Sequence, residues 1–176
     1  ALGYSVTVEQ GSFRSSNVVI GDPKSAKYLV TAHYDTCARL PFPNLITPCN
    51  FWTFLLYQLF ICLMLLVPPA AVGAAAGWLL HSFDLGYLLF MILLWASILL
   101  MMIGPANPSN VNDNTSGVVT LLEIARSLPE LHRKNVCFVL FDLEEAGLIG
   151  SASCRKKHKA EVSGQLVLNL DCVGEG

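Results

Sequence analysis

The feature that most constrains this chain is a long middle section with almost no charge. Between Leu40 and Asn112 the only formally charged residue is Asp84, although the chain has 11 basic and 13 acidic residues in all. Apolar residues make up 53% of the sequence, which is above the roughly 45–50% of ordinary soluble proteins. Two solvents are therefore implied, water for the charged flanks and lipid for the middle.

Two uncharged apolar runs in this middle section are long enough for membrane-spanning helices. They cover residues 51–67 and 85–103, which are seventeen and nineteen residues long. As a helix the second run spans about 28 Å, close to the thickness of the hydrocarbon core of a bilayer. Neither run has the polar stripe of a half-exposed helix, and a domain this small leaves little room for the alternative, two buried core helices. The sequence therefore predicts a transmembrane helical hairpin over residues 45–105.

Local features refine the predicted hairpin. Pro68 and Pro69 follow the first run and are expected to kink that helix or end it early, because proline lacks a backbone donor. The small residues Gly73, Ala74 and Gly77 allow close approach of the second helix. Two spans return the chain to the side on which it started, and the tip has no Lys or Arg. The positive-inside rule thus favours a membrane protein with its charged flanks in the cytoplasm.

The charged flanks have the pattern of an α/β domain. Strands that alternate with helices favour a mixed, mostly parallel sheet flanked by helices, and the hairpin interrupts it. Residues 1–44 and 106–176 are then expected to be two parts of one domain. Apolar and alternating runs predict strands at residues 4–8, 17–20, 28–32, 135–141 and 165–170, and apolar spacing predicts a helix at 116–128.

Side chains that can bind metal lie at the ends of these predicted elements, where the sites of open α/β sheets are found. Each group alone is more often a core histidine, a solvated carboxylate or a turn. Together, imidazole and carboxylates suit zinc, and of two adjacent carboxylates one can bind metal while the other takes a proton. These residues are His33 and Asp35 after strand 28–32, Glu144 and Glu145 after strand 135–141, Asp171 after strand 165–170, and Asp113 before the helix.

Four segments carry a resemblance to a known family. YLVTAHYDT, NVNDNTSGV, FVLFDLEEAGLIGS and LNLDCVGEG resemble, in order, the landmark motifs of the di-zinc aminopeptidases, peptidase family M28. The resemblance covers residues 20–35 and 107–176, and it implies a zinc-exopeptidase-like fold, a peptide substrate and two zinc ions.

The resemblance also implies a role for each polar residue. His33, Asp113 and Asp171 would bind the first zinc, and Asp113 would bridge to a second zinc that Glu145 also binds. Asp35 would orient the ring of His33. Glu144 would be the general base that takes a proton from water and passes it to the leaving amine.

Two departures from the family pattern stand out. The family supplies one more histidine to the second zinc, and His132 and His158 are poor replacements because they lie in charged, solvated stretches. We therefore expect that ligand in a C-terminal part outside this sequence, without which activity would be incomplete. The hairpin also lies between His33 and Asp113, which predicts an active site near the bilayer surface.

The sequence predicts a membrane-anchored zinc aminopeptidase, and other functions are alternatives. A single-zinc glutaminyl cyclase, or an inactive receptor or scaffold, would use the same fold. A small membrane transporter or assembly factor has little support, since the spans carry no intramembrane charge. The one basic cluster, residues 155–159, has no interleaved aromatic side chains, so we expect no nucleic-acid partner.

Overall fold

The computed structural model describes residues 3–40, 42–43, 45–46, 49–108 and 110–174. They form two compact units, one from residues 1–37 with 107–176 and the other from residues 38–106. The last two residues of the LNLDCVGEG motif, Glu175 and Gly176, lie outside the described residues.

The first unit is built on one five-stranded mixed sheet with the strand order β1-β2-β4-β3-β5. β2 pairs antiparallel with β1 and β4, whereas β3 pairs parallel with β4 and β5. The predicted α/β fold with a mixed sheet is thus confirmed. The strands are β1 (Val6–Gln10), β2 (Ser16–Ile20), β3 (Tyr28–His33), β4 (Val136–Phe141) and β5 (Leu166–Asn169).

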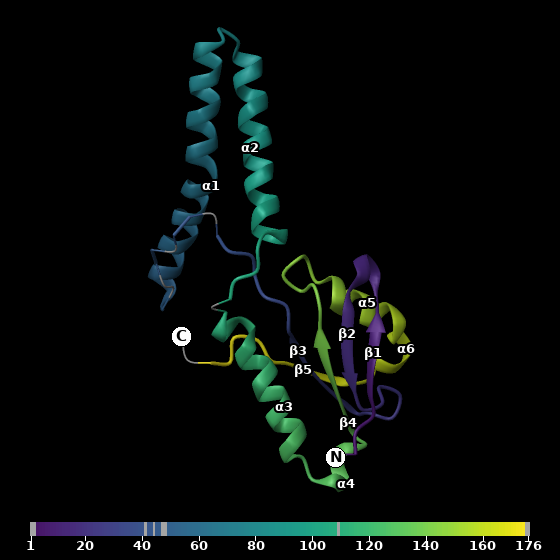
Figure 1. Cartoon of the computed structure of the whole chain (residues 1–176). Coiled ribbons are helices and arrows are strands. Elements are labelled where there is room, and N and C mark those ends of the chain that lie inside the picture. The colour runs from purple at the N-terminus through teal and green to yellow at the C-terminus, as the bar shows by residue number, and fades with distance from the viewer. Residues whose placement is uncertain (1–2, 41, 44, 47–48, 109, 175–176) are drawn as a thin grey trace. The chain divides into compact units, whose positions relative to one another are not determined.

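Helices cover both faces of this sheet (Figure 1). On one face, Leu121 and Ala125 of α3 (Gly117–Ser127) pack in a core with Val30 of β3 and other buried residues. On the opposite face, Leu29 belongs to a second core that includes Cys154 of α5. Neighbouring residues of a strand point to opposite faces, so β3 contributes to both cores. The remaining elements are α4 (Glu130–Arg133), α5 (Ile149–Lys157), α6 (Lys159–Val162), and the short η1 (Ser12–Arg14) and η2 (Val111–Ser116).

The second unit is a hairpin of two long helices, α1 (Phe51–Leu79) and α2 (Phe83–Ile103). Asn50 caps the N-terminus of α1. Its Oδ1 atom accepts hydrogen bonds from the backbone N–H groups of Trp52 and Thr53, both at 3.0 Å. Pro68 and Pro69 do not end α1, which continues through them to a length of 29 residues and bends along its course in Figure 1. Of the two expected outcomes, a kink or an early end, the early end is therefore wrong.

The two helices approach closely where both have glycine. A Cβ atom built on Gly86 would lie 2.6 Å from the backbone oxygen of Gly73 and 2.8 Å from the Cα of Gly77. Gly73 and Gly86 are buried. The hairpin thus uses the small-residue face that the sequence predicts.

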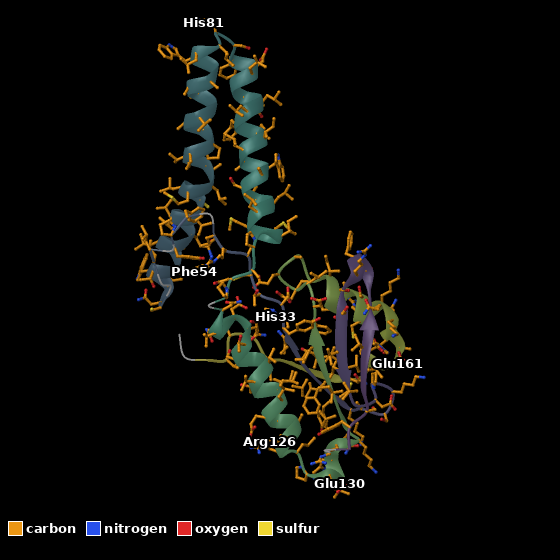
Figure 2. All side chains as sticks on the ribbon, viewed as in Figure 1. His33, Phe54, His81, Arg126, Glu130 and Glu161 are labelled. Atoms are coloured by element: carbon orange, nitrogen blue, oxygen red, sulfur yellow. The ribbon has the colours of Figure 1, made fainter. Side chains whose placement is uncertain are left out.

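The outer surface of the hairpin is apolar along its length. Within the two helices, only Pro69, Gly73 and Gly86 are buried, and many large apolar side chains are exposed along the outside, as Figure 2 shows. His81 lies at the tip between the helices. Both helices are long and apolar enough to cross a membrane, by length and composition.

Adding one methyl group at Gly86 tests this helix contact. Gly86→Ala would overlap the backbone of α1, so we expect it to destabilise the hairpin by about 1–3 kcal/mol. A Cβ on Gly77 would meet nothing closer than 3.4 Å, so Gly77→Ala is the matched control and should be neutral or stabilising. Thermal unfolding of both variants in detergent measures the difference, and equal melting temperatures would contradict the close packing.

Candidate metal centre

The candidate site is centred on His33, the last residue of β3. Its side chain is buried, with 3% of the residue exposed. The Nε2 atom lies 3.1 Å from Oδ1 of Asp113 and 3.8 Å from Oδ1 of Asp171. Asp113 belongs to η2 just before α3, and Asp171 follows β5, which runs parallel to β3. Three residues that are distant in sequence therefore meet at the carboxyl end of the sheet.

Two glutamates reach the same histidine from the loop after β4. His33, Glu144 and Glu145 offer ligand atoms that all lie within 4.8 Å of one another, and so do His33, Asp113 and Asp171. The structure thus brings all the predicted ligands and the predicted base to one edge of the sheet. The two groups share His33, and the bridging role of Asp113 stays a prediction.

Asp35 connects His33 to the glutamate loop. The Nδ1 atom of His33 lies 3.2 Å from the backbone oxygen of Asp35 and 3.4 Å from its Oδ1. The other carboxylate oxygen, Oδ2, accepts a hydrogen bond of 3.1 Å from the backbone N–H of Glu145. With Nδ1 held as a donor, Nε2 faces the acidic residues, which is the arrangement that a metal-binding histidine needs.

The crowding of carboxylates changes the protonation of the site. Burial alone would lower the pKa of His33, but its hydrogen bond with Asp35 and the charges of Glu144 and Asp113 raise it to about 9. Burial and, after it, the charge of Asp113 raise the pKa of Glu145 to about 7. Burial also raises the pKa of Glu144. Without a metal, the site therefore holds protons in place of a cation.

The residues present fit zinc. The Oε1 atom of Glu145 is buried and has no hydrogen-bond partner among the described residues, which is costly for a carboxylate unless a cation binds it. The available donors are imidazole and carboxylate, and zinc binds both. His33, Asp113, Asp171 and Glu145 can therefore hold metal at this edge.

His158 is not the solvated residue that the sequence suggests. It is only 8% exposed, and its Nε2 lies 2.9 Å from Oε2 of Glu9 on β1. Lys157 also contacts Glu9, at 3.0 Å. The expectation of a solvated His158 is wrong because its acidic partner is 149 residues away in the sequence. The pairing with Glu9 holds the imidazole ring of His158 at β1, the strand at the edge of the sheet.

Sequence reasoning assigned no role at the site to two buried asparagines. The Oδ1 atom of Asn114 accepts a hydrogen bond of 3.1 Å from the backbone of Gly117, and its amide group also bonds to backbone on both sides of Asp171. Asn17 of β2 bonds to backbone at both ends of the glutamate loop. No local pattern marks this role, since the partners of Asn17 and those of Asn114 beside Asp171 lie far away along the chain.

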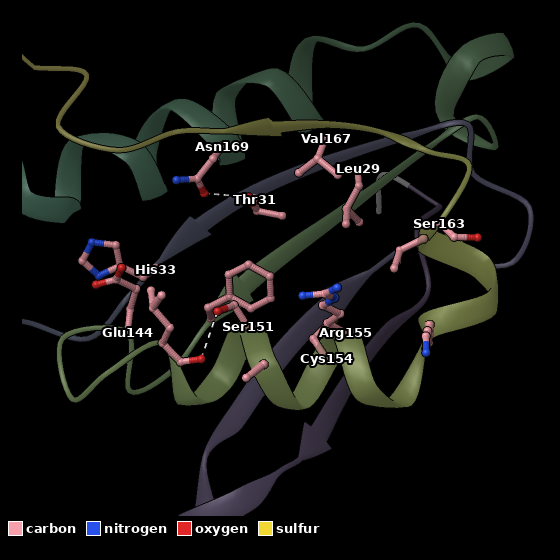
Figure 3. Close-up of a pocket in the computed structure, with 15 residues that line it drawn as sticks. Leu29, Thr31, His33, Glu144, Ser151, Cys154, Arg155, Ser163, Val167 and Asn169 are labelled. Atoms are coloured by element: carbon pink, nitrogen blue, oxygen red, sulfur yellow. Dashed lines mark hydrogen bonds between the residues drawn. The ribbon is translucent and has the colours of Figure 1, made fainter.

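A cavity of about 650 Å³ opens beside the site along the α5 side of β3 and β5. Figure 3 shows His33 and Glu144 together at one end of it and Arg155 of α5 further along. Thr31 and Asn169, joined by a hydrogen bond of 2.7 Å, form part of the wall between β3 and β5. The site thus has room next to the predicted base for part of a substrate.

An α/β sheet with imidazole and carboxylates at the ends of its parallel strands is the arrangement of a metal-dependent enzyme. Residues 101–176 match the family model for peptidase family M28, which confirms the family that the four motifs indicate. This part of the chain is similar to that family, a family of zinc-dependent peptidases. His33 and Asp35 precede the matched residues, and the sheet brings them to the site. Neither the curated proteins nor the solved structures gave a match.

The pKa values predict how pH affects the metal-free protein. His33 has a folded pKa of about 9, above its ordinary 6.5, so its stabilising protonated form is lost as pH rises through 9. Glu145 has a folded pKa of about 7, above its ordinary 4.5, so stability from its neutral form is lost as pH rises through 7. Both effects have the same sign. We expect the melting temperature of the metal-free protein to fall between about pH 5 and pH 9.

Zinc at pH 8 should reverse this loss, because the cation replaces the protons. Melting curves with chelator and with added zinc measure both effects. The double variant His33→Gln, Glu145→Gln should have a flatter profile and respond little to zinc. A metal-free protein whose stability rises steadily to pH 9 would contradict the assignment.

Proposed function

We propose that this protein is a membrane-anchored aminopeptidase that uses two zinc ions. The observation that carries the proposal is the convergence of His33, Asp113 and Asp171 with Glu144 and Glu145 at one edge of the sheet. His33, Asp113 and Asp171 would hold one zinc, and Asp113 and Glu145 would contribute to the other. The family match to residues 101–176 supports peptide hydrolysis over other reactions on this fold.

The chemistry divides between the metal and Glu144. His33, Asp113, Asp171 and Glu145 would hold zinc, which would supply a water molecule with a pKa lowered toward about 7 and polarisation of the scissile carbonyl. Glu144 lies within 4.8 Å of His33 and Glu145, as close as a ligand, and its raised pKa suits a group that must accept a proton and release it again. It takes the proton of the attacking water and gives it to the nitrogen of the leaving amine.

Removing the proposed base separates binding from catalysis. Glu144→Gln keeps the shape of the side chain but cannot accept a proton, so we expect kcat to fall about 10²- to 10⁴-fold. Zinc content should stay at two ions per full-length protein. Aminoacyl-anilide hydrolysis in detergent and metal analysis measure these quantities, and Glu130→Gln on exposed α4 is the control. Unchanged turnover would remove Glu144 from the mechanism, and a single zinc would favour the cyclase alternative.

We further propose that the hairpin anchors the enzyme in the lipid bilayer. Its exposed surface is apolar on all sides, and nothing within the hairpin covers it. The ends of the insertion are held together by backbone pairing. Ala38 and Ala106 form an antiparallel bridge, the N–H of Arg39 donates to Pro105 at 2.8 Å, and the N–H of Asn107 donates to Cys37 at 2.9 Å. The first unit can therefore close without the hairpin.

Excising the hairpin tests the anchor and the independence of the site together. Replacing residues 39–105 by a two-residue Asn-Gly turn joins Ala38 to Ala106, which are already paired. We expect the shortened full-length protein to leave the membrane fraction and to keep its affinity for zinc. Carbonate extraction and zinc titration measure the two outcomes. A shortened protein that stays in the membrane would contradict the proposed anchor.

A further inference from the structure

Asn17 closes the neck of the loop that carries the two glutamates. This β2 residue is 2% exposed. Its Nδ2 donates to the backbone oxygen of Gly150 at 2.8 Å, and its Oδ1 accepts from the backbone N–H of Asp142 at 3.1 Å. Asp142 and Gly150 flank the segment with Glu144 and Glu145. One amide side chain therefore joins the two ends of this loop.

The loop needs such a restraint because its backbone is strained. Leu143 and Leu148 have φ values of 53° and 60°, which lie in the left-handed region that residues other than glycine avoid. Conformations of this kind persist only where the surroundings enforce them. Within the loop, the N–H groups of Gly147 and Leu148 both bond to the oxygen of Glu144, at 2.9 and 2.8 Å. The position of the glutamate pair thus depends on a short turn whose neck Asn17 closes.

Asn114 restrains the opposite half of the site in the same way. It is 2% exposed and directly follows Asp113. Its Nδ2 donates to the oxygen of Leu170 at 2.9 Å, and its Oδ1 accepts from the N–H of Cys172 at 3.2 Å. Leu170 and Cys172 flank Asp171. The amide therefore fixes the backbone of Asp113 relative to that of Asp171.

Each asparagine packs closely against a glycine, which also lies close to the backbone of Asp142 or Leu170. A Cβ atom on Gly150 would lie 2.6 Å from the Oδ1 of Asn17, and one on Gly117 would lie 2.7 Å from the Nδ2 of Asn114. Both distances are shorter than real Cβ contacts allow. The two amides are thus each packed against a different motif of the sequence.

We propose that Asn17 and Asn114 are positioning residues that divide the site between them. Asn17 holds the glutamate pair, and Asn114 holds the two aspartates that face His33. An amide can donate and accept at once, as the two backbone groups require, and it adds no charge to a site already rich in carboxylates. The assignment rests on the proposed function.

A pair of substitutions in the full-length protein tests this division. Asn114→Ala should weaken zinc binding about 10- to 100-fold, in the range typical of residues that support metal ligands. It should also change the visible absorption spectrum of the Co²⁺-substituted protein. Asn17→Ala should leave the tightest zinc affinity and the spectrum at one equivalent of Co²⁺ unchanged, and it should lower kcat at saturating zinc by about 10- to 100-fold.

The opposite pattern in the two variants distinguishes positioning from a general loss of stability. If both variants lose zinc affinity and kcat in parallel, or if Asn17→Ala keeps full kcat, the division is overturned. Should either alanine variant not fold, Asn17→Ser and Asn114→Ser leave room for a water to satisfy the freed backbone groups, and the same outcomes apply. A wild-type protein that binds no zinc would instead overturn the proposed function.

Discussion

Four carboxylates converge on one buried imidazole where β3, β4 and β5 end, and their mutual repulsion is the constraint on which the rest of the site depends. Burial, and after it the like charge of Asp113, favours protonation, and together they raise the pKa of Glu145 to about 7. Such an arrangement is stable only if cations or protons compensate the charge and if the backbone holds the carboxylates against each other. The parallel strands bring the residues to the same edge, and the loops that follow must then be restrained by groups that carry no charge.

Neutral amides meet this requirement. Asn17 and Asn114 each make backbone hydrogen bonds that span a ligand-bearing segment, and each is packed against a glycine. This gives a physical meaning to Gly117 and Gly150 in the motifs NVNDNTSGV and FVLFDLEEAGLIGS. Gly117 leaves room for the side chain of Asn114, and Gly150 leaves room for the backbone of Asp142 as well as for the side chain of Asn17. If the two asparagines position the ligands as proposed, the motifs contain residues that support the site as well as residues that carry its chemistry.

The sequence predicts much of this structure because apolar alternation and charge absence are local signals. All five strands, the helix α3 and the gathering of His33 with the acidic residues follow from runs and their ends. The polar helix α5 escapes prediction because its apolar residues are few. Long-range hydrogen bonds cannot be predicted from local sequence either. Asn17 bonds to residues 125 and 133 positions away, and no short window of sequence contains Asn17 together with these partners. The continuation of α1 through Pro68 and Pro69 shows that the remaining turns of a long apolar helix outweigh two missing donors.

The backbone pairing at Ala38 and Ala106 has a consequence for how such a protein can arise. A segment whose two ends already meet can be gained or lost in evolution without disturbing the scaffold that receives it. The helical hairpin is then an insertion between β3, which ends at His33, and η2, which contains Asp113. If the hairpin anchors the enzyme in a bilayer, as proposed above, an ancestral form without it and a descendant with it could share the same interior, and their difference would lie in where they meet their substrates.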